Sequence, residues 1–245
     1  MTTAPSVPAT QFKFSIVVPT YNEAGGIERL ITTLTELFKT NALDGEIVVV
    51  DDNSPDGTGD IVDRLESAGF PVRCLHRPGK LGLSSGVIDG WKFARPESQA
   101  LGAMDADFSH DATIIPEMVH ALANGYGLAI GSRYVRGGGI TNWPLKRKIT
   151  SLVAIALAKP LTSVRDITSG YFLVRREALD GVELDPIGFK IGLEVIAKAH
   201  YGRAIEVPYV FVDRVAGESK LNSNEIFNYL RQLRRIYAAR LGGKT

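Results

Sequence analysis

The chain of 245 residues has a single cysteine, Cys74, and this scarcity limits its chemistry. One thiol cannot form an internal disulfide, and it excludes a zinc site built from several cysteines. The apolar setting of residues 72–75 predicts that Cys74 is a buried strand residue. The cysteine content is therefore compatible with a reducing cytosol.

Long apolar runs and an excess of one charge are also missing. The longest uninterrupted apolar run, residues 152–158, is far below the roughly 20 residues that a membrane-spanning helix requires. Lysine and arginine number 28 against 27 for aspartate and glutamate, so the net charge of +1 favours no nucleic-acid partner. We expect a chain that does not cross a bilayer and whose anion sites are local.

The first ten residues lack the positive start and the apolar core of a signal peptide. We interpret residues 1–10 as a flexible leader and 11–245 as one domain, because 44% hydrophobic and 22% charged residues suit a single core. The pattern within this domain changes after residue 131 and again near residue 224. We therefore expect three parts, at 11–131, 132–223 and 224–245.

Short β-branched runs alternate with helical patterns in the first part. Strands are predicted at 14–18, 46–50, 72–76, 101–104 and 128–130, and helices at 26–38, 58–68, 84–94 and 114–123. Such alternation is typical of parallel strands joined by crossover helices. The predicted fold class is α/β, with a doubly wound, mostly parallel sheet.

The second and third parts predict an α+β extension over the ligand edge of that sheet. It contains a glycine run at 137–139 that needs only to be a mobile loop, a basic amphipathic stretch at 145–161, and strands near 171–174 and 205–212. A C-terminal amphipathic helix is predicted at 224–241. We expect its apolar face to carry Ile226, Leu230, Leu233 and Tyr237, and its basic face Arg231, Arg234 and Arg235.

Polar residues follow three of the predicted strands, where ligands of open parallel sheets bind. These are residues 19–23, 51–54 and 105–107. The Asp105-Ala106-Asp107 motif is the most specific, because two carboxylates at this spacing can flank one Mg²⁺ or Mn²⁺ that also binds phosphate. Helix caps and turns are the alternative for any one loop. His110 is interpreted as a solvated or capping residue outside the site.

A dinucleotide-binding dehydrogenase is the rival interpretation of such a sheet. It needs the pattern G-x-G-x-x-G directly after the first strand, where this chain has Pro19-Thr20-Tyr21-Asn22-Glu23. The glycines at positions 79, 82 and 86 follow the third strand at the wrong spacing. The interpretation as a dinucleotide-binding dehydrogenase is therefore disfavoured.

Motifs along most of the chain resemble those of family 2 glycosyltransferases with the GT-A fold, specifically the dolichyl-phosphate mannosyltransferases and related polyprenyl-phosphate enzymes. The motifs that carry this resemblance are Val18-Pro19-Thr20-Tyr21-Asn22-Glu23, Val50-Asp51-Asp52-Asn53-Ser54-Pro55-Asp56-Gly57-Thr58, Met104-Asp105-Ala106-Asp107, Gly131-Ser132-Arg133-Tyr134-Val135, Asp166-Ile167-Thr168-Ser169-Gly170 and Asp213-Arg214-Val215-Ala216-Gly217-Glu218-Ser219-Lys220-Leu221. The chain departs from many relatives at Leu152 and Ile155, where they have Arg and Asn, and in its Gly188-Phe189-Lys190 segment.

The resemblance implies a nucleotide-sugar half at 11–131 and an acceptor half at 132–223. By similarity, the base and ribose are held by Pro19, Tyr21, Glu23, Val50 and Asp52, while Asp105, Ala106 and Asp107 meet the ribose, the diphosphate and the metal, with Ser109 adding an oxygen. Arg133, Arg214 and Lys220 then surround the donor diphosphate and the acceptor phosphate, with Arg147 and Ser151 as further acceptor contacts. The expected catalytic residues are Asp107, Arg133, Arg147 and Arg214.

The implied reaction is inverting transfer of a sugar, with GDP-mannose as the first donor and polyprenyl or dolichyl phosphate as the acceptor. UDP-glucose as the donor, a non-lipid acceptor, and a silent nucleotide-sugar binding module are the alternatives. A lipid acceptor favours an interfacial helix at 145–161, with Lys146, Arg147 and Lys148 at headgroup level, over an ordinary core helix. The expected location is peripheral, on the cytoplasmic face of a membrane, by direct contact or through a membrane-anchoring subunit.

Overall fold

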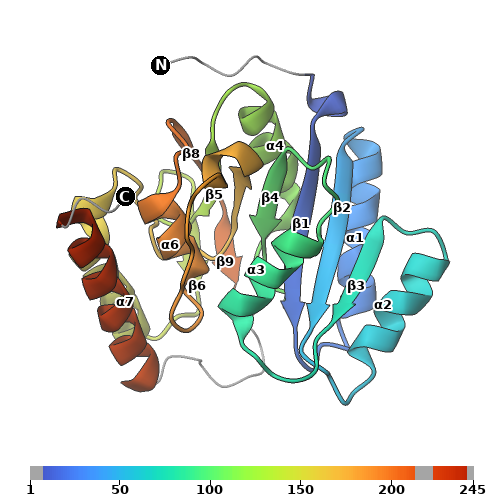
Figure 1. Ribbon diagram of the computed structural model, residues 1–245, viewed down its shortest axis with the longest axis horizontal. Helices are drawn as coiled ribbons and strands as arrows, with labels where there is room; N and C mark the ends of the chain where they lie inside the picture. Colours follow the sequence, from blue (N-terminus) through green and yellow to red (C-terminus); the bar gives the residue numbers. More distant parts are fainter. Residues whose placement is uncertain (1–7, 213–222, 242–245) are drawn as a thin grey trace.

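A seven-stranded sheet forms the centre of the computed structural model, which describes residues 8–212 and 223–241 (Figure 1). Its strand order is β3-β2-β1-β4-β7-β5-β8. The strands are β1 (Lys13–Thr20), β2 (Asp44–Asp51), β3 (Val72–His76), β4 (Ala100–Ala103), β5 (Leu128–Ser132), β7 (Phe172–Arg175) and β8 (Ala204–Pro208). β7 runs antiparallel to β4 and β5, and the other pairs are parallel.

Helices cover both faces of this sheet, as Figure 1 shows. One face packs against α1 (Ile27–Thr40), α2 (Thr58–Ser67) and α4 (Ile115–Ala123), and the other against α3 (Leu83–Phe93), α6 (Ile191–Lys198) and α7 (Ser223–Leu241). Neighbouring residues of β1 show why both faces are apolar: Ile16 and Val18 lie in one core cluster and Val17 in the other. The predicted doubly wound α/β sheet is confirmed.

Three predicted details of the strands are corrected. The predicted strand near 205–212 is interrupted at Tyr209, so that β8 remains in the main sheet and β9 (Val210–Val212) leaves it. β9 pairs with β6 (Gly139–Thr141), so the third glycine of the run that was expected to be a mobile loop begins a strand. Cys74 is half-buried, because β3 is an edge strand of the sheet.

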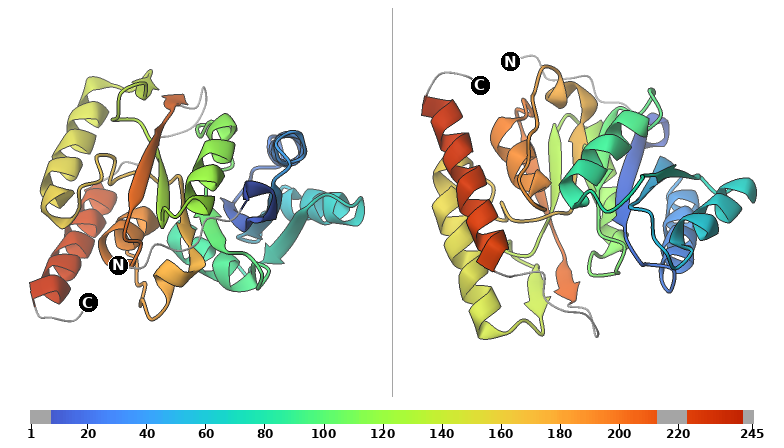
Figure 2. Two further views of the ribbon diagram at one scale, coloured as in Figure 1. Left: turned by 90° about the horizontal axis from the view of Figure 1, so that it is seen from above. Right: turned by 60° about the horizontal axis from the view of Figure 1, so that its bottom comes forward.

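The C-terminal helix α7 lies beside α5 (Leu145–Ala158), as Figure 2 shows. Hydroxyl groups of α7 donate to backbone carbonyls near the end of α5, with Tyr229 Oη at 2.6 Å from Ala154 O and Tyr237 Oη at 2.8 Å from Leu157 O. The predicted inward face of α7 was partly wrong. Its buried residues are Tyr229, Gln232, Leu233 and Ile236, whereas Ile226 and Leu230 are 44% and 46% exposed.

The helical segments also answer two predictions, on the extent of α5 and on membrane crossing. α5 continues as a single turn of 3₁₀-helix at Lys159–Leu161, which matches the predicted stretch at 145–161. Within residues 8–212 and 223–241, no helix has both the length and the apolar character that crossing a membrane requires.

Candidate active site

The loop after β4 presents two carboxylates at the carboxyl edge of the sheet. Asp107 Oδ1 accepts hydrogen bonds from the Ser109 amide at 3.0 Å and the Ser109 hydroxyl at 2.6 Å, across a turn in which Phe108 is left-handed with φ of 59°. Asp105 is one-third exposed, and Ala106 between the two is buried. The predicted metal ligands Asp105, Asp107 and Ser109 all offer oxygen atoms in this one loop, and oxygen is the donor type that a hard cation such as Mg²⁺ or Mn²⁺ prefers.

His110 supports this loop and is buried, so the expectation of a solvated side chain was wrong, whereas a capping role agrees with the hydrogen bond that it accepts from the backbone. Its Nδ1 accepts a hydrogen bond from the Asp105 amide at 3.0 Å, and its ring stacks on Tyr171 at a centroid distance of 4.8 Å. Burial lowers the pKa of His110, although Asp105 and Asp107 act in the opposite direction. The neutral imidazole therefore positions the backbone of the Asp105-Ala106-Asp107 motif.

The loops after β1 and β2 form the predicted nucleotide side of the site. Pro19 and Val50 are direct partners in the pairing of β1 with β2, so they lie side by side at the ends of these strands. Tyr21 is exposed, with Lys80 Nζ at 4.0 Å from the centre of its ring. The Glu23 amide donates to the Thr58 hydroxyl, at the start of α2, at 3.0 Å. These residues are thus placed on one edge, as predicted.

Asp52, predicted to contact the nucleotide, is buried and has an extensive set of partners. Its Oδ1 accepts from Arg77 Nη1 at 2.8 Å, and its Oδ2 accepts from the Leu81 and Gly82 amides, each at 3.1 Å. Sequence reasoning missed Arg77, which follows β3 and also donates to Ser85 at 2.7 Å. The only signal was its position just after the predicted third strand. Asp52 therefore fixes the shape of the loop that follows β3.

Arg133 follows β5 and is held by a buried carboxylate, Asp166. The Arg133 side chain donates to Asp166 through Nε and Nη2, each at 2.7 Å, and the Arg133 amide donates to the same carboxylate at 3.0 Å. Burial alone lowers the pKa of Arg133, but the hydrogen bonds and charge of Asp166 outweigh it and raise that pKa. Arg133 is therefore a permanent, pre-oriented cation.

An aromatic cluster connects Arg133 with the carboxylate loop. We define this cluster as His110, Trp143, Tyr171, Tyr209 and Phe211, whose neighbouring rings lie 4.8 to 6.5 Å apart. The guanidinium of Arg133 lies 5.4 Å from the centre of the Trp143 ring, and that of Arg147 lies 4.1 Å from it. The cluster thus brings two predicted phosphate-binding arginines to the same edge as the carboxylates.

Two further residues complete this part of the site. Ser151, predicted to contact the acceptor, is buried in α5 and accepts a hydrogen bond from Tyr134 Oη at 2.8 Å. Lys190, which precedes α6, was not predicted as a site residue, although it belongs to the segment that departs from many relatives. Burial and the charge of Arg133 lower the pKa of Lys190 to about 8, while Asp166, Asp105 and Glu225 oppose this shift. The Lys190 ammonium is therefore influenced by the charges of Arg133 and Asp166.

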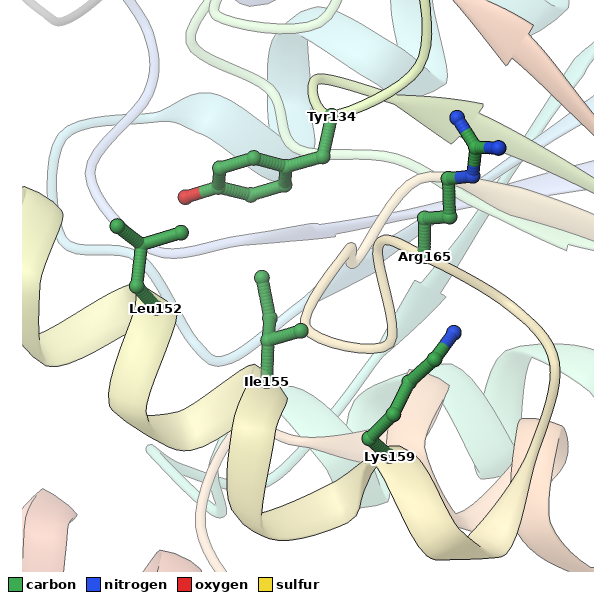
Figure 3. Close-up of a pocket in the computed structure, with 5 residues that line it drawn as sticks. All are labelled: Tyr134, Leu152, Ile155, Lys159 and Arg165. Atoms are coloured by element: carbon green, nitrogen blue, oxygen red, sulfur yellow. The ribbon is translucent and has the colours of Figure 1, made fainter.

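A pocket of about 360 Å³ opens beside these residues, between α5 and the segments before and after it (Figure 3). Leu152 and Ile155 project into it from α5, opposite the ring of Tyr134, while Lys159 and Arg165 line its other end. The two positions where the chain departs from many relatives thus make this pocket apolar. Arg214 and Lys220, the remaining predicted site residues, lie outside the described residues.

Comparison with known protein families identifies the family of this chain. The family model described as "Glycosyl transferase family 2" matches residues 15–182, from β1 to the segment beyond β7. The match includes the three loops at the carboxyl edge, Arg133 and Asp166. The chain therefore belongs to glycosyl transferase family 2.

Curated relatives narrow this assignment. The chain is 45% identical to a dolichol-phosphate mannosyltransferase of Pyrococcus furiosus over 91% of its own length, and it spans 63% of the length of that relative. It is 37% identical to the Saccharomyces cerevisiae protein of the same name, covering 95% of this chain and 90% of that protein. These similarities put the chain in the dolichol-phosphate mannosyltransferase group of family 2.

Solved structures of more distant proteins share the fold. A mannosyltransferase from Pyrobaculum calidifontis, solved with GDP-Man and Mn²⁺, aligns with a TM-score of 0.63 at 20% identity, covering 96% of this chain and 66% of that one. Mannosyl-3-phosphoglycerate synthase from Rubrobacter xylanophilus aligns with a TM-score of 0.65 at 17% identity, covering 96% and 76%. The predicted GT-A type of sheet is thereby confirmed.

Proposed function

We propose that this chain transfers mannose from GDP-mannose to the phosphate of a dolichyl or other polyprenyl lipid, with inversion at the anomeric carbon. The observation that carries the proposal is the aromatic cluster. Through His110 it contacts the carboxylate loop, which is suited to a metal-bound diphosphate, and through Trp143 it contacts the buried, pre-oriented Arg133. The names of the curated relatives support the same reaction.

The donor half of the proposed site is the edge formed by the ends of β1, β2 and β4. Asp105, Asp107 and Ser109 would hold a divalent cation, Mg²⁺ or Mn²⁺, through oxygen atoms. Held by these residues, such a cation would supply positive charge that stabilises the departing nucleoside diphosphate. The Mn²⁺ in the solved Pyrobaculum calidifontis structure supports a divalent metal of this kind. Tyr21 and Glu23 are proposed to contact the nucleoside.

The acceptor half needs no strong general base. The second pKa of a phosphate monoester is about 6, so the attacking oxygen is already largely ionised at neutral pH. Arg133, held by Asp166, and Arg147, stacked on Trp143, are proposed to bring this anion beside the donor diphosphate. Because these cations are positioned before the substrates bind, little reorganisation is required when charge develops.

A lipid acceptor also accounts for the apolar exposure of α5. Leu145, Ile149, Leu152 and Val153 are each more than half exposed, with Lys146 and Lys148 exposed among them. Phe227, on the neighbouring helix α7, is also exposed, at 67%. An exposed apolar face with lysines beside it suits the headgroup region of an anionic membrane. We propose direct contact with the cytoplasmic face of a membrane, with a membrane-anchoring subunit as the alternative.

The pocket beside α5 is proposed to receive the first part of the prenyl chain. Tyr134 lines it and also donates to Ser151, so the pocket begins next to the proposed phosphate contacts. Leu152 and Ile155 give it an apolar wall (Figure 3). A lipid tail would leave this pocket along the exposed face of α5.

A donor-by-acceptor assay tests the proposal. Purified protein is incubated with GDP-mannose or UDP-glucose, each with dolichyl phosphate or a short water-soluble phosphate monoester, and the products are resolved by mass spectrometry and NMR. We expect the fastest transfer from GDP-mannose to the lipid, with inverted configuration. Preference for UDP-glucose, or equal transfer to both acceptors, would overturn the donor or the acceptor assignment, respectively.

A pair of arginine variants serves as the control for the site in the same assay. Arg133→Ala should lose far more transfer than Arg64→Ala, because Arg64 forms an exposed ion pair with Glu28 at 2.8 Å. Exposed pairs contribute about 0–1 kcal/mol. Equal activity in the two variants would remove Arg133 from the site.

A further inference from the structure

A second group of potential metal ligands lies away from the candidate active site, where α2 packs on the edge strand β3. It consists of Asp63 from α2 and of Cys74 and His76 from β3. One donor atom from each residue lies within 4.8 Å of the others. We define these three residues as the edge triad.

The geometry of the two elements produces this grouping. Cys74 and His76 are two residues apart on a strand, so their side chains point to the same face of β3. Asp63 comes from the helix packed against that strand, and both its carboxylate oxygens approach His76 Nε2, at 3.0 and 3.1 Å. The three donors therefore already converge, and a cation between them needs only small side-chain movements.

Glycine at position 59 permits the close approach of α2 to His76. A Cβ added there would lie 2.7 Å from His76 Cε1, which is closer than real contacts of this kind. The missing side chain at position 59 therefore leaves room for the His76 ring against α2. His76 and Asp63 remain half-exposed, so a metal ion can enter from solvent.

The charge around the triad favours a cation. Burial, together with the carboxylates of Asp63, Asp51, Asp60 and Glu66, raises the pKa of the Cys74 thiol to about 12. Such an arrangement repels a free thiolate but is complementary to a divalent ion bound by that thiolate. On binding, Cys74 Sγ releases its proton to solvent and donates an electron pair to the metal.

We propose that the edge triad binds a zinc ion that links α2 to β3. Thiolate, imidazole and carboxylate are each groups that bind zinc, and a water molecule would complete four-coordination. The Asp105-Ala106-Asp107 loop differs, because it offers oxygen atoms alone and suits Mg²⁺ or Mn²⁺. This inference is independent of the proposed transferase activity.

Binding of Zn²⁺ and of Co²⁺ as its spectroscopic substitute tests the proposal. The metal-free full-length chain is titrated with CoCl₂ and followed by near-ultraviolet thiolate-to-cobalt absorption, and Zn²⁺ affinity is obtained by calorimetry. We expect one equivalent to bind, with the absorption band lost in Cys74→Ser. The affinity of His76→Gln should fall at least about tenfold, since even the loss of an outer-shell partner costs about 10–100-fold.

Two control variants separate this site from its surroundings. Asp107→Asn should keep the cobalt band and the zinc affinity, because it alters only the oxygen site at β4. Asp60→Asn, which changes a nearby charge but no ligand, should shift the affinity less than His76→Gln does. Circular dichroism verifies folding, and His76→Gln keeps the test valid if Cys74→Ser does not fold, because His76 is half-exposed.

The effect of zinc on thermal stability gives a second readout. A ligand that binds only the folded state raises the melting temperature, so Zn²⁺ should raise it in the wild type and in Asp107→Asn but not in His76→Gln. The absence of stoichiometric binding, equal binding by His76→Gln and wild type, or loss of binding in Asp107→Asn would each overturn the proposal.

Discussion

The buried pair of Arg133 and Asp166 offers a strong test of the site, through the change Asp166→Asn. The Asp166 side chain is 0% exposed and that of Arg133 8%, and two side-chain hydrogen bonds of 2.7 Å join them. The change leaves a buried guanidinium opposite a neutral amide. Breaking a buried pair in this way costs about 3–5 kcal/mol, because the remaining charge is uncompensated.

For a chain of this size, 1 kcal/mol corresponds to a change of about 2–4 °C in melting temperature, so a fall of about 6–20 °C is expected. Urea unfolding should show a lower midpoint at an unchanged slope. Transfer activity should also fall at temperatures where the variant is folded, because the guanidinium loses the carboxylate that orients it.

Glu177→Gln is the matched control, since it breaks an ion pair with Arg175 in which the Glu177 side chain is 62% exposed. It should cost at most about 1 kcal/mol. A double variant, Arg133→Met with Asp166→Leu, should regain stability without activity, because apolar side chains of similar size can replace a buried pair at little cost. A loss below about 1 kcal/mol in Asp166→Asn would refute the reasoning.

Three further predictions concern the metal, a titrating lysine and the membrane. Asp107→Asn should abolish Mn²⁺-dependent transfer and weaken Mn²⁺ binding in calorimetry. Asp111→Asn, which removes the charge from the same kind of turn with Thr113, should do neither. Full activity of Asp107→Asn would disprove the ligand role. Burial and a neighbouring arginine lower the pKa of Lys190 to about 8, so kcat/KM for the donor should decline as the pH rises through 8 and the ammonium is lost. Lys190→Arg should move that decline to higher pH. Identical pH profiles of the variant and the wild type would contradict this prediction. Changing Leu152 and Ile155 together to Asp should reduce flotation with anionic vesicles. The same change should reduce transfer to a long prenyl phosphate more than transfer to a short one. Equal losses of transfer to the two acceptors would indicate a core role for α5.

Local patterns were enough to predict the parallel half of the sheet and the sheet edge to which the candidate site residues belong. The strand at 72–76 and the helix at 58–67 follow the predicted bounds to within a residue, because apolar periodicity is a property of neighbouring residues. The position of Asp105 and Asp107 after a buried strand could likewise be read directly, since the ends of parallel strands gather at one edge.

Other features depend on residues far apart in the chain, and for that reason sequence patterns did not reveal them. The antiparallel direction of β7 is decided by its pairing with β4 and β5. The burial of His110 depends on stacking against Tyr171, and the inward face of α7 depends on its contact with α5. Amphipathic periodicity shows that α7 has a buried side, but contacts with α5 and with the Lys190 carbonyl place Tyr229 and Gln232 on it.

The same distinction applies to the charged groups of the site. The sequence by itself identified Arg133 and the motif that begins at Asp166 as chemically significant, because both resemble motifs of the family. Only the tertiary structure showed that Arg133 and Asp166 form a pair, and only it showed that Arg77 donates to Asp52. Side-chain hydrogen bonds form between groups that folding brings together, and a linear sequence records residue types but not these distances.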